Sequence, residues 1–222
     1  MLFACIDAAA SRPAHSRAAA SLHCRRSWMM PRRRTRALAK TWQRLLLVML
    51  LAFVAWYGWR QPWAIAMREV WQLSRMPAPD ALPVPVHGVR ARHIADTWGG
   101  ARSGGRKHQG VDIFAPRGTP VASTTHGVIA RTGDYGLGGR QVWIIGPGGE
   151  RHYYAHLDSI APGIARFGRV TPGTLIGFVG DSGNARGTPT HLHYGLYAAS
   201  GAHNPWPLLQ AGARRDTPTA TR

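Results

Sequence analysis

Short runs of β-forming residues, separated by Gly and Pro, fill the chain from Val89 to about Leu209. They include VDIF, GVIARTG, QVWIIG, HYYAHL and HLHYGLY. Runs of this length between turn residues are typical of antiparallel strands, and no stretch here keeps the 3.6-residue period of a helix. The sequence therefore predicts a compact all-β domain of antiparallel sheet over residues 89–210. A domain of about 120 residues can bury one core and needs no metal to fold.

An uninterrupted apolar run, Leu45–Trp59, precedes this domain. Extended to Trp42 and Trp63, it is long enough to cross a hydrocarbon core of about 30 Å, and terminal Trp side chains suit the membrane interface. We therefore expect a single transmembrane helix over residues 42–63. A cleaved signal peptide is the alternative, because Ala64-Ile65-Ala66 has the small-x-small pattern of a cleavage site. That site lies well beyond the apolar run, which favours an uncleaved anchor.

Charge around the anchor predicts its orientation. Ten Lys and Arg residues lie upstream of Leu45, where the only acidic residue is Asp7. Basic flanks stay on the cytoplasmic side, so we expect residues 1–41 in the cytoplasm, a single pass through the cytoplasmic (inner) membrane, and a periplasmic or extracytoplasmic domain. The Ala-rich start has no periodicity and resembles an over-extended reading frame, with Met29 or Met30 as the true start.

Two further segments flank the expected domain. Residues 64–88 begin with helical spacing and continue into a segment with four prolines, which predicts a stiff, extended linker. At about 3.1 Å per residue, such a linker would hold the domain roughly 30 Å from the membrane. Residues 211–222 are polar and are expected to form a disordered tail.

Net charge and cysteine content exclude several classes of protein. The whole chain carries a formal charge of +18. From Gln61 onward, 17 basic side chains face 9 acidic ones, a net +8 that would attract a polyanion. Nucleic-acid binding is not favoured, because no stripe of basic residues interleaved with aromatics follows Gln61. Both cysteines, Cys5 and Cys24, precede the domain, so a metal site there must use His and carboxylates.

Two motifs could build such a metal site. His191 and His193 lie two residues apart in HLHYGLY, and positions i and i+2 of a strand share a face. His108 and Asp112 of HQGVD would lie about 13 Å apart in a straight strand, too far for one ion, but Gly110 allows a bend. Two histidines and a carboxylate have the composition of an open catalytic zinc site.

A third motif, YYAHL, contributes His156. Regular alternation would place His156 on the same face as Tyr154, and alone it would be read as an ordinary core or surface histidine. Three other histidines are expected in loops or on the surface: His126, His152 and His203.

Together with the APRGTPV run and the glycines around LIGFVGDSG, these motifs resemble the lysostaphin-like, LytM-type zinc endopeptidases from about Ile94 to Leu209. The resemblance implies an antiparallel β domain of the LytM/lysostaphin (duplicated hybrid motif) type with a narrow groove. It implies one Zn²⁺ held by His108, Asp112 and His193. It also implies that His156 and His191 are catalytic and flank the water that the metal activates.

Three positions depart from the family pattern. Arg140 and Gln141 stand where a smaller residue or Asn is common, and Thr190 replaces a frequent Pro before HLH. These residues are expected near the groove, so they bear on specificity and not on the metal.

The resulting hypothesis is a membrane-anchored zinc-dependent endopeptidase that hydrolyses peptide cross-links of bacterial peptidoglycan. An H-E-x-x-H motif is absent, so His191 or His156 is expected to take the proton, because an imidazole titrates near neutral pH. One alternative is a catalytically silent LytM-type domain that activates or scaffolds wall hydrolases. The intact ligand positions argue against this alternative. Another is a secreted general protease. The choice of cross-bridge and the oligomeric state stay open.

Overall fold

The computed structural model describes residues 32–215, with side chains from residue 38 onward. The chain divides into two units, one that ends at Leu51 and one that begins at Ala52. The expectations for the first 31 residues, including the start at Met29 or Met30, and for residues after 215 lie outside the described residues.

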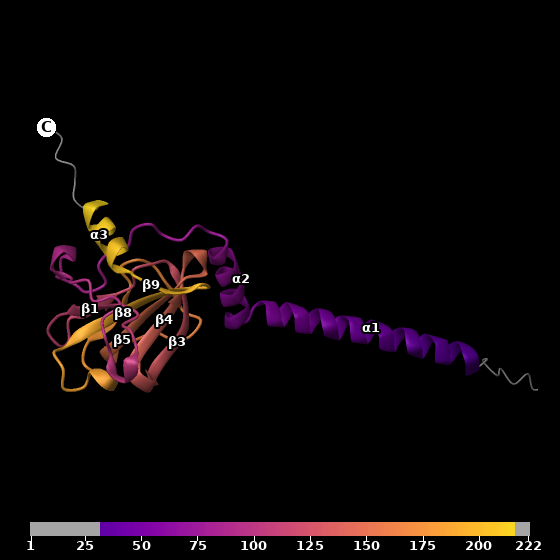
Figure 1. Cartoon of the computed structure of the whole chain (residues 1–222). Helices are drawn as coiled ribbons and strands as arrows, with labels where there is room; N and C mark the ends of the chain where they lie inside the picture. The colour runs from indigo at the N-terminus through magenta and orange to yellow at the C-terminus, as the bar shows by residue number, and fades with distance from the viewer. Residues whose placement is uncertain (1–31, 216–222) are drawn as a thin grey trace, which may run out of the picture. The chain divides into compact units, whose positions relative to one another are not determined.

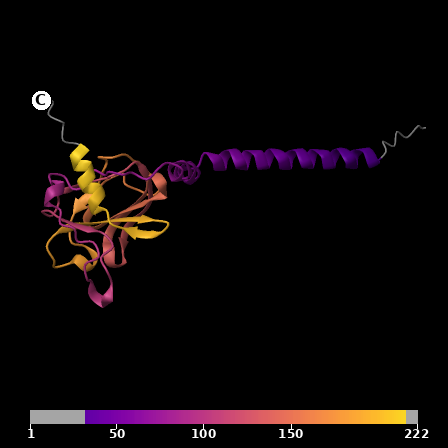
Figure 2. The ribbon, with the colours of Figure 1, turned by 45° about the horizontal axis from the view of Figure 1, so that its top comes forward.

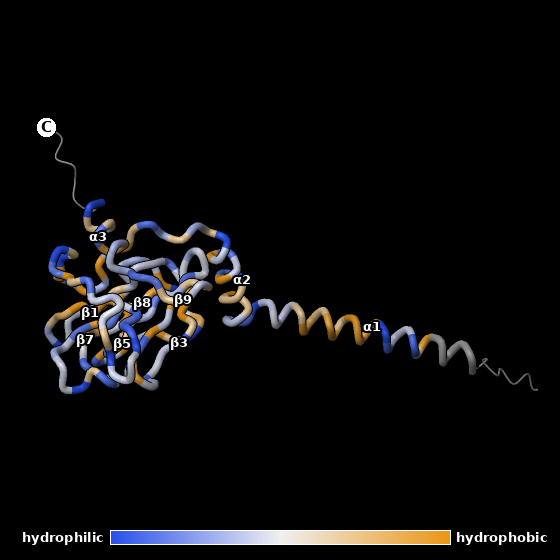
Figure 3. Tube along the Cα trace, viewed as in Figure 1, coloured by the Kyte–Doolittle hydropathy of each residue, from blue (hydrophilic) through white to orange (hydrophobic). Residues whose placement is uncertain are grey.

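Helix α1 (Arg32–Trp59) contains the apolar run. Its segment Leu38–Trp59, 22 residues with a mean hydropathy of 1.5, is long and apolar enough to cross a membrane by length and composition. Figure 3 shows these apolar residues in orange and more polar residues in blue toward the N-terminal end of the helix. The helix ends at Trp59, so the expected end at Trp63 was too late. Trp63 belongs to the separate helix α2 (Pro62–Ser74).

The second unit is built on a nine-stranded sheet in which every pairing is antiparallel, which confirms the predicted all-β class (Figure 1). The main path runs β1-β8-β5-β4-β3-β6, while β2 pairs with β7, β7 with β5, and β9 with β8. The strands are β1 (Val111–Phe114), β2 (Pro120–Ala122), β3 (Gly127–Tyr135), β4 (Gly139–Ile145), β5 (Arg151–Ile160), β6 (Arg169–Val170), β7 (Leu175–Val179), β8 (His191–Ala198) and β9 (Gly201–His203).

Alternation along the strands separates the core from the face that carries polar groups. On β8, Leu192, Tyr194 and Leu196 are fully buried in the main core. On β1, Val111 and Ile113 point into the same core. The intervening residues of both strands therefore project from the opposite face, as a period of two requires.

The Pro-rich segment is part of the domain, contrary to the expected free spacer. Leu82 and Val86 are each 1% exposed and belong to the main core. The Leu82 N–H donates to the Leu208 carbonyl over 3.0 Å, and Val86 forms a β-bridge with Val121. Prolines remove donors and stiffen this segment, but the apolar residues between them still pack. The spacer interpretation overlooked their burial.

Helix α2 also packs on the β domain. Ala66 and Leu73 are buried in a small cluster with Val128 of β3, and Glu69 forms an ion pair with Arg169 of β6. The helical spacing that the sequence indicated after Ala64 is therefore present, in a helix that begins at Pro62 and does not simply prolong α1.

Helix α3 (Trp206–Arg215) overlaps the segment expected as a disordered tail, and Figure 2 shows it in yellow against the strands of the domain. Leu209 is fully buried. Gly212 lies so close to Leu82 that a Cβ would collide with the Leu82 carbonyl oxygen. The helix was missed because its apolar face is only one short stripe.

Candidate active site

Strands β1 and β8 bring the expected metal ligands together. Asp112 pairs with His193 across the two strands, and Asp112 Oδ1 lies 3.1 Å from both His108 Nε2 and His193 Nδ1. The candidate ligand atoms of these three residues all lie within 4.8 Å of one another. His108 and Asp112 are buried. A histidine and an aspartate from one segment thus meet a histidine of a distant strand at a single point.

Gly110 makes this meeting possible in two ways. The chain bends at this residue, immediately before β1. A Cβ on Gly110 would also lie 2.6 Å from His193 Cε1 and 2.6 Å from the Tyr194 carbonyl oxygen. The sequence predicted the bend, whereas the need for space beside the His193 ring became visible only in the fold.

Hydrogen bonds orient the ligands. The Nδ1–H of His108 donates to the Thr97 carbonyl over 2.7 Å, which leaves Nε2 as the unprotonated nitrogen facing Asp112 and His193. The backbone N–H of Asp112 donates to Thr97 Oγ1 over 3.0 Å. Thr97 therefore holds both candidate ligands of the HQGVD motif, His108 and Asp112. Metal ligands commonly need support of this type. Sequence reading did not single out Thr97.

Arg102 is a second residue that sequence reading missed. Its guanidinium forms an ion pair with Asp112 Oδ2, while Oδ1 faces the two histidines. Burial raises the pKa of Asp112, but the hydrogen bonds that His193 and Arg102 donate to its carboxylate outweigh it and hold the pKa well below its usual range. Asp112 is therefore ionised, as a metal ligand must be. In the sequence, Arg102 differs from its neighbours only by its charge, so nothing there pointed to this role.

An irregular backbone places His156 on the face of the sheet that carries the candidate ligands. Its φ of 61° lies in the left-handed region, which non-glycine residues rarely adopt. From Arg140 to Val142 the β4 chain advances two residues while the paired β5 chain goes from Leu157 to Tyr154, so β5 carries one extra residue in a β-bulge. Tyr154 stays in the core, and the expectation that His156 shares its face is therefore wrong.

His156 and His191 lie side by side next to the three candidate ligands. The ring centroid of His156 is 5.1 Å from that of His191 and 5.8 Å from that of His193. Each donates its Nδ1–H to a backbone carbonyl over 2.8 Å, His156 to Ser182 and His191 to Pro189. Burial lowers the pKa of His156 to about 4. His156 is therefore neutral near pH 7, and its Nε2 is free to accept a proton.

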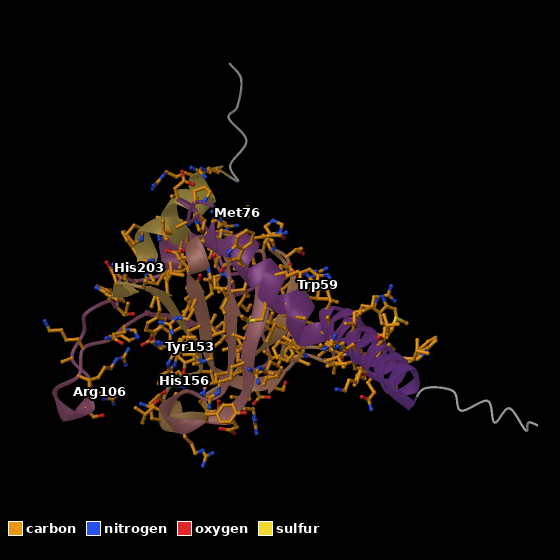
Figure 4. All side chains as sticks on the ribbon, turned by 90° about the vertical axis from the view of Figure 1, so that its right-hand side faces the viewer. Trp59, Met76, Arg106, Tyr153, His156 and His203 are labelled. Carbon is orange, nitrogen blue, oxygen red and sulfur yellow. The ribbon has the colours of Figure 1, made fainter. Side chains whose placement is uncertain are left out.

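These residues lie in a groove with two unequal halves. The larger half, called here the wide half, has a volume of about 760 Å³. The smaller half, called here the narrow half, has a volume of about 220 Å³. Both halves are lined by Asp112 and His156, so the cluster lies where they meet. His193 lines the wide half and His191 the narrow one. Figure 4 shows Tyr153 and His156 on the face of the sheet beside the loop that carries Arg106.

The donor set fits a catalytic metal ion. Two imidazole nitrogens and one carboxylate oxygen converge on one point, and the fourth side is open to the groove. Three protein ligands with an open position are the arrangement of catalytic zinc sites, whereas structural sites are closed by a fourth ligand.

His152 has a structural place that the sequence did not suggest. It was expected in a loop or on the surface, but it is fully buried, and its Nδ1 lies 3.1 Å from Thr124 Oγ1 and 2.8 Å from the Tyr194 hydroxyl. His203, also expected in a loop or on the surface, is on β9 with its Nε2 3.1 Å from Glu150 Oε1. His126 is exposed, as expected.

The residues that depart from the family pattern support the groove. Gln141 is buried, donates to the Tyr135 carbonyl over 2.7 Å and accepts a hydrogen bond from Trp143 Nε1 over 3.0 Å. Thr190 donates to the Ala115 carbonyl over 2.7 Å and so joins the start of β8 to the end of β1.

An antiparallel β domain with an open His–Asp–His centre in a groove defines a domain of the metallopeptidase class. Residues 106–205 match the sequence profile of peptidase family M23. The chain belongs to this family through that domain.

The chain is similar to several known proteins. It is 41% identical over 145 residues to an L-Ala–D-Glu endopeptidase of Bacillus subtilis, a match that covers 60% of this chain and 44% of the relative. It is 33% identical to the crystallised catalytic domain of lysostaphin from Staphylococcus simulans, covering 53% of this chain and 91% of that domain (TM-score 0.46). A lytM protein of Ruminococcus gnavus, described as a candidate glycyl-glycine endopeptidase, is 32% identical with a TM-score of 0.51, covering 66% of this chain and 63% of that one. The chain thus spans less than half the length of the B. subtilis relative.

Proposed function

We propose that this protein is a membrane-anchored, zinc-dependent endopeptidase that hydrolyses peptide bonds of bacterial peptidoglycan, cross-links included. The observation that carries the proposal is the convergence of His108, Asp112 and His193 within 4.8 Å in an open groove. Membership of peptidase family M23 and the L-Ala–D-Glu bond named for the B. subtilis relative support it.

One Zn²⁺ would be held by His108 Nε2, Asp112 Oδ1 and His193 Nδ1. When bound, it would supply a Lewis acid that polarises the scissile carbonyl and makes water a better nucleophile. The chain prepares this centre by burying His108 and Asp112, by fixing the tautomer of His108 through Thr97 and by orienting Asp112 through Arg102.

His156 and His191 are the proposed proton carriers. Because the Nδ1–H of each is given to a backbone carbonyl, Nε2 is the only nitrogen that can accept a proton. One of them takes the proton from the attacking water and later returns it to the leaving amine. The other stabilises the developing oxyanion if its Nε2 has first taken a proton from solvent. General acid–base catalysis of this kind contributes about 10²–10⁴-fold to a rate.

Anchoring by α1, with its N-terminus in the cytoplasm and the domain outside the cytoplasmic membrane, completes the proposal. It is supported by the length and hydropathy of Leu38–Trp59, by the basic residues upstream of Leu45 and by the wall substrate. The burial of Ala66 of α2 in a cluster with Val128 of β3 favours an uncleaved anchor, because cleavage after Ala66 would cut inside a packed helix. In intact cells, a cysteine introduced by Ser200→Cys should react with an impermeant maleimide.

The test uses the full chain in detergent with purified peptidoglycan, and mass spectrometry of the released fragments. We expect new peptide termini that disappear with chelator and return with Zn²⁺. His156→Ala should keep bound zinc, measured by elemental analysis, and lose cleavage. A catalytically silent domain would release nothing, and a general protease would also digest casein. Full activity of His156→Ala would contradict the role of that residue.

A further inference from the structure

One wall of the wide half of the groove is a hairpin of residues 99–108, called here the basic hairpin. Backbone hydrogen bonds join its two arms, from Gly99 N–H to the His108 carbonyl over 2.9 Å and from Arg102 N–H to the Arg106 carbonyl over 2.8 Å. Its tip contains Gly104 and Gly105, both with φ of 72°. Because one arm ends in the ligand His108, the hairpin is fixed to the catalytic centre.

Cations of the basic hairpin line the wide half, namely Arg102, Arg106 and Lys107. The only carboxylate in that lining is Asp112, and Arg102 already pairs with it. Arg106 donates only to Ser103, through Nε to the carbonyl over 3.1 Å and through Nη2 to Oγ over 3.2 Å. Within residues 38–215, neither Arg106 nor Lys107 has an ion-pair partner. Two exposed, uncompensated cations thus face the space next to the metal centre.

Aromatic rings line the wide half as well. Trp143 stacks on Tyr153 with ring centroids 4.1 Å apart, and Tyr197 lies 5.4 Å from Trp143. Gln141 holds the Trp143 indole in place. Such flat rings can support the body of a peptide, and they leave the hairpin cations as the charged groups that can select among peptides.

The narrow half has a different chemistry. Phe114, Thr188 and Pro189 line it together with His191, and its only cation is Arg102, which it shares with the wide half. At about 220 Å³ it suits a small, neutral residue. A peptide that crosses the centre therefore meets an asymmetric site, in which the narrow half has one cation, Arg102, and the wide half has three.

We propose that Arg106 and Lys107 bind a free carboxylate on the substrate residue next to the scissile bond. The inference rests on the proposed function and names its substrate class. The substrates are wall peptides whose cleaved bond adjoins an acidic residue such as D-Glu or diaminopimelate, and neutral glycine bridges are poor substrates. A hydrogen bond between a guanidinium or ammonium group and a carboxylate is charge-assisted, whereas a glycine bridge offers these cations no counter-charge.

The test compares two synthetic dimers of the stem peptide with a D-Ala–diaminopimelate cross-link. One carries free carboxylates on D-Glu and diaminopimelate, and the other carries carboxamides there. A third substrate is a dimer joined by pentaglycine. The full chain in detergent with Zn²⁺ is assayed for kcat/KM on each by chromatography and mass spectrometry. We expect kcat/KM to be about five- to tenfold higher for the carboxylate dimer than for the carboxamide dimer, because exposed charge pairs contribute little free energy each.

Matched variants assign the preference to the hairpin. Arg106→Gln combined with Lys107→Gln should lower kcat/KM on the carboxylate dimer about five- to tenfold and leave the carboxamide dimer unchanged. Arg106→Lys combined with Lys107→Arg keeps both charges and should keep the preference. Arg214→Gln, which removes one charge from α3, should have no effect.

The outcomes separate this inference from the proposed function. If the wild-type chain cleaves the carboxamide or pentaglycine dimer as fast as the carboxylate dimer, or if the double Gln variant keeps the preference, the carboxylate site is overturned while the endopeptidase stands. If whole peptidoglycan and all three dimers stay intact with zinc present, the proposed function itself has failed.

Discussion

His156 combines a strained backbone with a proposed chemical role. A positive φ at a residue with a Cβ costs about 1–2 kcal/mol, and such residues cluster at functional sites, where the surrounding structure maintains them. Here the β-bulge and the hydrogen bond to the Ser182 carbonyl hold the ring beside His191 and His193. The strained backbone turns the His156 side chain toward the groove, whereas regular alternation would point it into the core.

Replacement of His156 by Gly separates these two effects. His156→Gly should lose activity by about 10²-fold or more because the imidazole is gone. Its free energy of unfolding should be at least equal to that of His156→Ala, because Gly adopts positive φ without penalty. Denaturant unfolding and peptide release measure the two quantities. A Gly variant less stable than the Ala variant would show that no strain is present.

Gly110 provides a prediction about the metal. In Gly110→Ala the new Cβ would meet the His193 ring and the Tyr194 carbonyl oxygen, so His193 must move. We expect Gly110→Ala to lose roughly 10–100-fold in zinc affinity, as for lost support of a ligand, with a parallel loss of activity. Competition with a zinc-sensitive chelator measures the affinity. Unchanged affinity would mean that the His193 ring has space to spare.

His152 gives the domain a pH dependence. Burial lowers the pKa of His152 to about 3 in the folded chain, against an ordinary value of 6.5. Between these values the unfolded chain binds a proton that the folded chain does not, so the free energy of unfolding falls as the pH falls through this window. One proton contributes at most about 1.4 kcal/mol per pH unit. His152→Gln should therefore show a shallower loss of thermal midpoint between neutral and acidic pH. Equal slopes for both proteins would exclude His152 as the source.

At the scale of elements, the segment between α2 and the strands acts as part of the core. Leu82→Ala should lower the free energy of unfolding by about 2–5 kcal/mol, because it empties a buried site. Met76→Ala, a change at an exposed position of the same segment, should stay within about 0.5 kcal/mol. Denaturant unfolding of the full chain in detergent measures both. A free spacer would give small effects at both positions.

The strands could be read from the sequence, because a period of two is visible in runs such as HLHYGLY. The same period correctly placed His191 and His193 on one face. It failed at His156, since a bulge depends on the pairing of β5 with β4 and leaves no mark in the alternation. Leu82 and helix α3 were missed for a related reason: each is buried by the other, and neither carries a long apolar pattern of its own.

At the scale of the whole molecule, the core and the proposed metal centre are separate. The buried apolar cluster and the candidate ligands Asp112 and His193 lie on opposite faces of β1 and β8. Thr97 holds His108 and Asp112 through its own hydrogen bonds. Chelation should therefore abolish hydrolysis while the β-sheet circular dichroism persists, and zinc should restore activity. Loss of the sheet signal on chelation would contradict this independence.

The same separation explains what the sequence could predict of the site. Residue type and spacing were sufficient to single out His108, Asp112, His191 and His193, since ligand chemistry is a property of side chains. The choice of His193 as a ligand and the catalytic role of His156 came from the resemblance to the LytM-type endopeptidases. Thr97, Arg102 and the buried environment of His152 depend on which segments become neighbours in space, and nothing local in the sequence records that.

Three of the four clustered histidines, His108, His156 and His191, give their Nδ1 proton to main-chain oxygens of Thr97, Ser182 and Pro189. A main-chain oxygen is present whatever amino acid occupies its position. The side chains at those three positions can therefore vary without deleting an acceptor, and only a rerouted loop can do so. The path of the polypeptide therefore determines which ring nitrogen of these three histidines carries the proton.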